Sequence, residues 1–252
     1  MTRERARAWA VAAAGAGLAA VLVRAELGNP LVSLVAAAWL VLLPALALLQ
    51  RPPPVSEIRA HRIGFYAASI AVLAVVALVT LGVAPGLADP AGLRLDWPPA
   101  PRQLLVPAAA LTAAGVVVAY AFRALSGPLG WRETETVRAL VPATPREKGM
   151  FALLSATAGF SEELVFRGFL PTLFMPLSAS YLLAALPVAA VFGLLHAYQG
   201  PHGIVRAGTI GAVLAAGVAW TGSLWPSIFA HAALDLLFGL VLGKSLLGEP
   251  PA

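Results

Sequence analysis

The sequence predicts an all-α membrane protein, a polytopic bundle of about eight transmembrane helices. Of its 252 residues, 60% are hydrophobic and 12% are charged, whereas a typical soluble domain carries about 25% charged residues. The mean hydropathy is +0.84. The apolar residues also gather into runs long enough to cross a bilayer as helices, and polar loops separate these runs. These observations favour a multi-pass membrane bundle over a soluble fold.

Eight apolar runs form the predicted spans. They cover about residues 8–23, 30–49, 63–87, 104–125, 150–175, 181–198, 204–221 and 224–242. The first run follows a basic start that is also typical of a secretory signal peptide, but we expect a transmembrane helix because further spans follow. Pro44 is a place where the second helix can kink. The eighth run begins at Trp225-Pro226, since proline is favoured in the first turn of a helix.

The longest polar connection covers residues 126–149. Its portion 131–140 could lie on the membrane surface as a short helix, or it could form an ordinary solvated loop. We find no repeat of fixed period and no soluble domain. The chain therefore divides into an N-terminal part, residues 1–149, of transmembrane helices and this loop, and a C-terminal transmembrane core, residues 150–252.

The net charge of +5 indicates membrane topology rather than nucleic-acid binding, because the basic residues are scattered through short loops. The basic residues of the terminal segments and of alternate loops fall on one side of the predicted bundle. They are Arg3, Arg5, Arg7, Arg51, Arg59, Arg62, Arg123, Arg132, Arg138, Arg146, Lys148, Arg206 and Lys244. Positive residues collect on the cytoplasmic side, so we expect both termini there. The absence of cysteine excludes disulfides, thiolate catalysis and cysteine-ligated metals.

The fifth run contains three ionisable residues, Glu162, Glu163 and Arg167. A charge at membrane depth costs about 2.5–3.5 kcal/mol on insertion scales, so all three require a reason. Glu163 and Arg167 are four residues apart, share one helix face and can pair. Glu162 is rotated about 100° from Glu163 and is reached less readily by the arginine. A buried pair alone could simply lock neighbouring helices together, but the second carboxylate indicates chemistry.

The other ionisable residues at membrane depth lie on two later spans. His196 follows Phe192 at four-residue spacing, so the two share a face, and a lone histidine there can also be an ordinary buried residue. His231 and Asp235 are likewise four apart, and an aspartate at that spacing can fix the tautomer and orientation of a histidine. Because all these residues fall in the second half of the chain, we expect them to form one site.

This set of residues suits hydrolysis. A carboxylate removed from water is a better base near neutral pH, and a histidine can share the proton transfer or donate to an oxyanion. The sequence has no G-x-S-x-G or other serine-nucleophile signature. Water activated by Glu162 is therefore the simplest attacking group. A zinc site formed by Glu162, His196 and His231 is the mechanistic alternative.

Three motifs, in order along the spans, carry a family resemblance. They are Glu162-Glu163-x-x-x-Arg167, Phe192-x-x-x-His196 and His231-x-x-x-Asp235. The three together resemble the CPBP family of intramembrane proteases, which includes type II CAAX prenyl endopeptidases, bacteriocin-processing proteins and the so-called Abi proteins. The resemblance covers about residues 151–244, and the first four spans carry no motif that matches.

The resemblance implies a helical membrane fold with its catalytic site in a polar cavity between the C-terminal spans. It implies that Glu162 is the general base, acting with His196 to activate a water, and that Glu163 and Arg167 are structural supports. It also implies a protein embedded in a bacterial plasma membrane, in contact with its peptide or protein substrate.

By the same resemblance, His231 and Asp235 would stabilise the oxyanion. In the prenyl endopeptidases the last position is typically asparagine, whereas here it is aspartate, as in many bacterial relatives. A carboxylate cannot donate a hydrogen bond unless it is protonated. We therefore expect Asp235 to orient His231, or to be neutral through burial. This difference weakens the inference of a CAAX substrate and slightly favours a metal.

The sequence thus predicts a glutamate-type intramembrane endopeptidase that cleaves membrane-associated substrates, prenylated or not. We expect no cofactor, with zinc as the alternative, and no nucleic-acid partner. Two other functions stay open. One is a non-catalytic immunity or scaffold protein of the same fold. The other is a proton-coupled transporter, against which the asymmetric placement of the ionisable residues argues.

Overall fold

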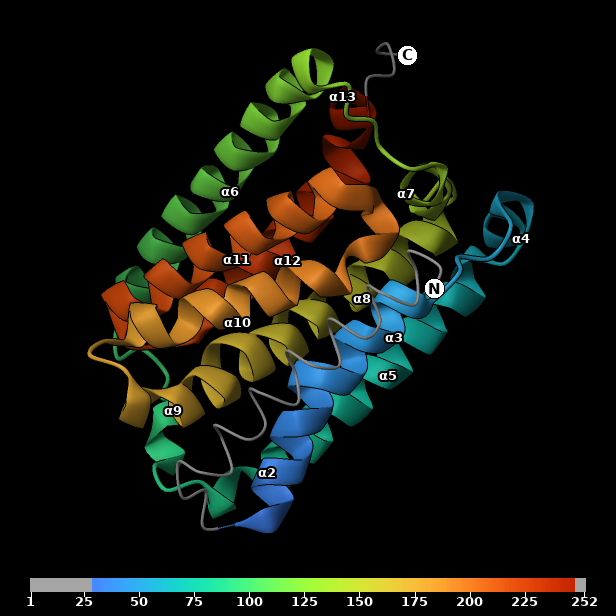
Figure 1. Cartoon of the computed structure of the whole chain (residues 1–252). Helices are drawn as coiled ribbons and strands as arrows, with labels where there is room; N and C mark the ends of the chain where they lie inside the picture. Colours follow the sequence, from blue (N-terminus) through green and yellow to red (C-terminus); the bar gives the residue numbers. More distant parts are fainter. Residues whose placement is uncertain (1–28, 248–252) are drawn as a thin grey trace.

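The computed structural model describes residues 29–247, which form helices and loops and include no strand (Figure 1). The elements of the predicted membrane segments are α2 (Pro30–Ala37), η1 (Ala38–Leu42), α3 (Leu43–Leu49), α5 (Arg62–Val83), α6 (Pro101–Leu129), α8 (Pro145–Glu163), η4 (Leu164–Phe169), α9 (Leu170–Phe174), α10 (Tyr181–Leu195), α11 (Gly200–Thr221), α12 (Trp225–Leu236) and η7 (Leu237–Val241). The shorter connecting elements are α4 (Val55–Ala60), η2 (Ala84–Gly86), η3 (Pro90–Leu93), α7 (Glu135–Leu140), η5 (Met175–Leu177), η6 (Ala197–Gln199) and α13 (Gly243–Leu247). The predicted all-α membrane bundle is confirmed.

The predicted runs within the described residues each coincide with a helix, apart from a few residues at their ends. Within residues 29–247, four helical segments are long and apolar enough to cross a membrane, namely Pro30–Leu49, Arg62–Gly86, Pro101–Leu129 and Ala197–Thr221. Two further apolar helices are shorter, Tyr181–Leu195 and Trp225–Val241. The fifth run is the continuous helical segment α8, η4 and α9. The first run, 8–23, lies outside the described residues, so the count of eight spans stays a prediction.

Local sequence explains where helices begin and bend. Thr144 starts α8 with a capping box, because its hydroxyl accepts from the Glu147 N–H while Glu147 Oε2 accepts from the Thr144 N–H. The Thr134 hydroxyl caps α7 by accepting from the Val137 N–H, and the segment after residue 134 forms a short helix. In the second run, the π-helical turn η1 ends two residues before Pro44, which has no N–H to donate. A wider turn accommodates this break in the hydrogen-bond ladder.

The segment α8–η4–α9 lies at the centre of the bundle. It packs against α5, α10 and α12, and Figure 1 shows it running between α10 and α5. Every residue of η4 and α9 is buried, including the large side chains of Phe169 and Leu170. The fifth helical segment therefore carries the core of the fold together with the ionisable residues that the sequence placed in it.

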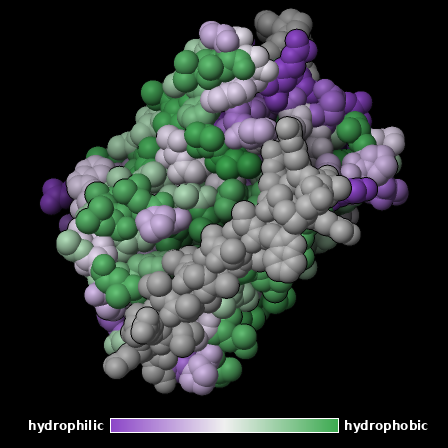
Figure 2. Space-filling view, in the orientation of Figure 1, coloured by the Kyte–Doolittle hydropathy of each residue, from purple (hydrophilic) through white to green (hydrophobic). Residues whose placement is uncertain are grey.

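The polar connections gather at two opposite ends of the bundle. At one end Arg62 Nε donates to the Ala139 carbonyl at 2.6 Å, and the Tyr66 hydroxyl donates to the Leu140 carbonyl at 2.6 Å. These bonds tie α5 to α7, and α4 lies beside them. Figure 2 shows hydrophilic atoms gathered at this end and hydrophobic atoms over the long helices α6, α10 and α11. The predicted basic side of the membrane thus corresponds to one physical end of the molecule.

At the other end, the loop before α6 is fastened to the connection between α11 and α12. The Leu224 N–H donates to the Arg94 carbonyl at 2.9 Å, and Trp225 Nε1 donates to the Leu95 carbonyl at 2.8 Å. The Thr172 hydroxyl, at the end of the central segment, donates to the Gly92 carbonyl at 2.8 Å. The loops that the sequence assigns to alternate sides are therefore separated by the length of the helices.

The gathering of basic loops predicts that the end with α4 and α7 is cytoplasmic. Because the chain has no cysteine, single cysteines can report on each end. In intact spheroplasts of a bacterial host, a membrane-impermeant maleimide should label Ala91→Cys and leave Arg146→Cys unlabelled until the membrane is permeabilised. Both positions are exposed. The opposite labelling pattern would overturn the predicted orientation.

A buried hydrogen bond between the second and third spans predicts a stability change. Trp39 Nε1 donates to the Thr80 hydroxyl at 3.1 Å, and Thr80 is fully buried. Thr80→Val leaves the indole N–H without this acceptor and should lower the free energy of unfolding by about 1 kcal/mol. Thermal unfolding in detergent measures this. Thr112→Val is the matched control, because the Thr112 hydroxyl bonds only the Ala108 carbonyl of its own helix, and it should change stability less.

Candidate active site

Glu163 and Arg167 form an ion pair at the centre of the bundle. Arg167 Nη1 lies 3.0 Å from Glu163 Oε1, and both side chains are almost completely buried. The contact is held by charge rather than by hydrogen-bond geometry, since Nη1 has no hydrogen-bond partner within residues 29–247. The guanidinium also lies 4.2 Å from the centre of the Phe192 ring, as a cation–π contact. The pairing predicted from the four-residue spacing is confirmed.

A glycine on α11 leaves room for this arginine. Arg167 Nε donates to the Gly211 carbonyl at 3.4 Å. A Cβ atom at residue 211 would lie 2.5 Å from Arg167 Nη2, closer than any side chain allows. Because the arginine must sit within the bundle to reach Glu163, a larger residue here would push it out of the ion pair.

His231 lies on α12 and contacts the same carboxylate oxygen. Its Nδ1 is 2.8 Å from Glu163 Oε1, and the ring is buried. Glu163 therefore joins Arg167 on its own helix to His231 on a neighbouring one. The carboxylate accepts, so Nδ1 carries the proton in this bond. Glu163 thus orients His231 in addition to pairing with Arg167.

The other ring nitrogen of His231 faces two further carboxylates. Nε2 lies 3.7 Å from Glu162 Oε2 and 3.9 Å from Asp235 Oδ2. The expectation that Asp235 orients His231 is corrected by this arrangement, because the hydrogen bond at Nδ1 goes to Glu163. Asp235 reaches only the far side of the ring, and its side chain is 35% exposed. Glu162 is also partly exposed, at 20%, so both acids remain accessible.

His196 joins the site through Phe192. It ends α10, and its Nδ1 lies 3.0 Å from the Phe192 carbonyl. The carbonyl only accepts, so Nδ1 donates and Nε2 is left with its lone pair. The Phe192 ring lies 4.7 Å from the His196 ring and 6.1 Å from the His231 ring. The structure thus gathers the six predicted site residues, five through polar contacts and His196 through this aromatic neighbour.

Glu162 lines a cavity of about 220 Å³. The cavity lies between α3, α5 and the central segment, and Leu195, next to His196, also lines it. The sequence predicts a polar cavity between the C-terminal spans, but this one extends to two N-terminal spans and has mostly apolar walls. The spans that contain α3 and α5 carry no motif, so the sequence could not indicate that they pack beside the central segment.

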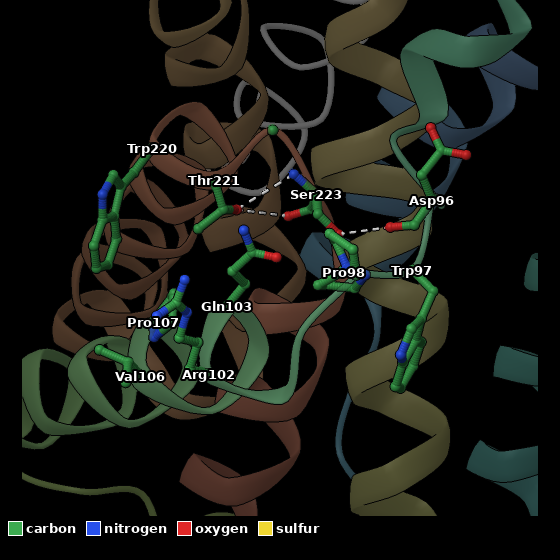
Figure 3. Close-up of a pocket in the computed structure, with 12 residues that line it drawn as sticks. Asp96, Trp97, Pro98, Arg102, Gln103, Val106, Pro107, Trp220, Thr221 and Ser223 are labelled. Carbon is green, nitrogen blue, oxygen red and sulfur yellow. Dashed lines mark hydrogen bonds between the residues drawn. The ribbon is translucent and has the colours of Figure 1, made fainter.

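A larger hollow, of about 580 Å³, lies at the opposite end from α4 and α7. Figure 3 shows it between Trp97, Arg102 and Trp220, at the start of α6 and the end of α11. None of the six site residues lines it. The chemistry of the carboxylates and histidines, and not the volume of the hollow, therefore identifies the candidate site.

The alternative zinc site does not fit this arrangement. Within the described part of the chain, no group of three or more His, Asp or Glu side chains is placed to hold one metal ion. Glu162 and His231 approach each other, but His196 shares no polar contact with either in this geometry. The side chains themselves therefore carry the chemistry considered for this site.

Comparison with known proteins gives one family match. Residues 145–237 match the family described as type II CAAX prenyl endopeptidase Rce1-like. The matched segment begins with α8 and ends where η7 starts, and it includes all six site residues. No curated protein and no solved structure matches the chain.

Removing Arg167 should destabilise the protein strongly. Arg167→Met leaves the Glu163 carboxylate buried without its cation, and breaking a buried ion pair costs about 3–5 kcal/mol. Thermal unfolding of the purified protein in detergent measures the loss. The double variant Arg167→Met with Glu163→Gln should recover part of it, because an uncharged amide needs no cation. An unchanged melting temperature in Arg167→Met would contradict the pairing.

Proposed function

We propose that this chain, a member through residues 145–237 of the Rce1-like family of type II CAAX prenyl endopeptidases, is an intramembrane endopeptidase in which Glu162 activates the attacking water. The observation that carries the proposal is the different bonding of two adjacent carboxylates. Glu163 is fully buried and bonded to Arg167 and His231, whereas Glu162 is partly exposed and lines a cavity. One acid thus builds the site, and the other is left to react.

In the proposed reaction, the Glu162 carboxylate takes a proton from water as the water oxygen bonds to the carbonyl carbon of the substrate. The carbonyl π electrons move to the oxygen and form a tetrahedral oxyanion. When this intermediate collapses, the C–N bond breaks and the proton passes from Glu162 to the leaving amine. His196, with its Nε2 lone pair facing away from the Phe192 carbonyl, can share these proton transfers.

His231 is suited to stabilise the oxyanion. Its Nδ1 is committed to Glu163, so a protonated ring presents its second N–H on Nε2. That nitrogen faces the side on which Glu162 and Asp235 lie. The buried Arg167–Glu163 pair fixes the ring, so this donor needs little reorganisation when charge develops.

The residues that line the Glu162 cavity favour a substrate that enters from the bilayer. Leu46 of α3 and Val72 of α5 line it, and both are more than half exposed on the outside of the bundle. Peptide chains carrying an apolar anchor can follow such a surface from lipid to the carboxylate. A prenylated peptide, the substrate that the family description names, has this chemistry. We propose a membrane-associated peptide as the substrate class, and prenylation as the property to test.

The proposed test measures peptide cleavage by the purified full chain in detergent. A farnesylated CAAX peptide and the same peptide without the farnesyl group are offered to the wild type, each with and without a chelator. Glu162→Gln should lower kcat by about 10²–10⁴-fold, the usual contribution of a general base. Glu57→Gln is the matched control, because Glu57 is exposed on α4 and lies far from the site, and it should retain full activity.

Each outcome separates one alternative. Cleavage of the farnesylated peptide alone identifies prenyl recognition, and cleavage of both identifies an unprenylated substrate class. Activity lost in chelator would make the enzyme metal-dependent. Full activity in Glu162→Gln would overturn the glutamate mechanism. Two results together would favour the immunity or scaffold function. The wild type would cleave neither peptide, and Glu162→Gln would still perform the protein's cellular role in its host.

A further inference from the structure

Tyr198 lies beside His196, one of the six site residues, and is not itself one of the six. It sits in η6, two residues after His196, and the two rings are 6.1 Å apart. Tyr198 is 42% exposed. A partly exposed phenol therefore stands beside His196, at the edge of the candidate site.

Gln199 and Arg206 fix the direction in which this hydroxyl donates. Arg206 Nη2 donates to Gln199 Oε1 at 2.9 Å, and Gln199 Nε2 donates to the Tyr198 hydroxyl oxygen at 3.0 Å. A guanidinium can only donate, so it must meet the oxygen of the amide, and the amide nitrogen must then face the phenol. The phenol oxygen accepts this bond. Its own proton is left to donate elsewhere.

Glu133 anchors the other end of this chain of hydrogen bonds. Its carboxylate accepts from Arg206 Nη1 and lies 3.1 Å from His202 Nε2. Burial by itself would raise the pKa of Glu133, but the hydrogen bonds and charges of Arg206 and His202 hold that pKa below its ordinary value. Thr134, the next residue, donates its hydroxyl to the Tyr198 carbonyl at 3.0 Å. The loop before α7 thus holds both the side chain network and the backbone of η6.

The close packing around Gln199 also constrains the network. Gly203 lies one turn into α11, below the Gln199 side chain. A Cβ atom at residue 203 would lie 2.3 Å from the Gln199 Cβ. Glycine at this position lets the amide lie between Arg206 and Tyr198, so the network depends on a residue with no side chain.

The proposed hydrolysis lacks a second oxyanion donor. Two donors commonly stabilise the tetrahedral intermediate of acyl transfer. His231 can supply one, whereas an ionised Asp235 can only accept. We infer that the Tyr198 hydroxyl is the second donor to the oxyanion, an inference that rests on the proposed function. Gln199 and Arg206 are positioning residues that turn its proton toward the substrate.

The test is Tyr198→Phe in the purified full chain, assayed with the peptide that the wild type cleaves. Removal of one oxyanion donor lowers kcat by about 10²–10³-fold. The donor acts only on the charge of the transition state, so kcat and kcat/KM should fall together with KM unchanged. Tyr120→Phe is the matched control and should leave kcat unchanged, since among the described residues the Tyr120 hydroxyl bonds Ser245 of α13, at 3.3 Å, and no residue of the site.

A double-mutant cycle separates positioning from a structural role. Gln199→Leu frees the phenol to rotate and should lower kcat, while the double variant Tyr198→Phe with Gln199→Leu should be no slower than Tyr198→Phe alone. Additive losses, or full kcat in Tyr198→Phe, would overturn the role of Tyr198 while the proposed function stands. If the wild type cleaves neither the farnesylated nor the unprenylated peptide, the proposed function fails and the role of Tyr198 fails with it.

Discussion

The buried carboxylate of Glu163 is the constraint on which the rest of this structure depends. A charge that cannot reach water must be paired, and a misplaced partner costs several kcal/mol. Glu163 meets Arg167 at 3.0 Å and His231 at 2.8 Å through one oxygen. The arginine in turn needs the space left by Gly211 and the face of Phe192. One ionised group therefore fixes the relative positions of the central segment, α10, α11 and α12.

This arrangement separates the two adjacent acids into different roles. Glu163 points into the bundle and holds a histidine, while Glu162, about a quarter of a turn away, lines a cavity with mostly apolar walls. In the proposed enzyme, the buried Glu163 would orient the oxyanion donor His231, and the accessible Glu162 would perform the proton transfer. A site built on packed helices holds such groups with little loss of geometry. Both acids lie within residues 145–237, which match a family described as endopeptidases.

The network around Tyr198 extends the site toward the polar end of the molecule. Glu133 belongs to the longest polar connection, residues 126–149, and His202 lies in the first turn of α11. Glu133 contacts both His202 and Arg206, and Arg206 in turn reaches Gln199. A connection between helices thus participates in positioning a side chain beside His196. Loops held by such hydrogen bonds can carry function on a rigid scaffold.

The sequence by itself determined the helical membrane class, the positions of the helices and the Glu163–Arg167 pair. These follow from hydropathy and from four-residue spacing, which are local properties of one helix. Only the tertiary structure decided that His231 bonds Glu163 rather than Asp235, that α3 and α5 wall the cavity, and that Gln199 directs Tyr198. Each of these contacts joins different elements or depends on how a side chain turns. Residues 68 apart, such as Glu163 and His231, leave no periodic signal, because their distance is set by how the helices pack.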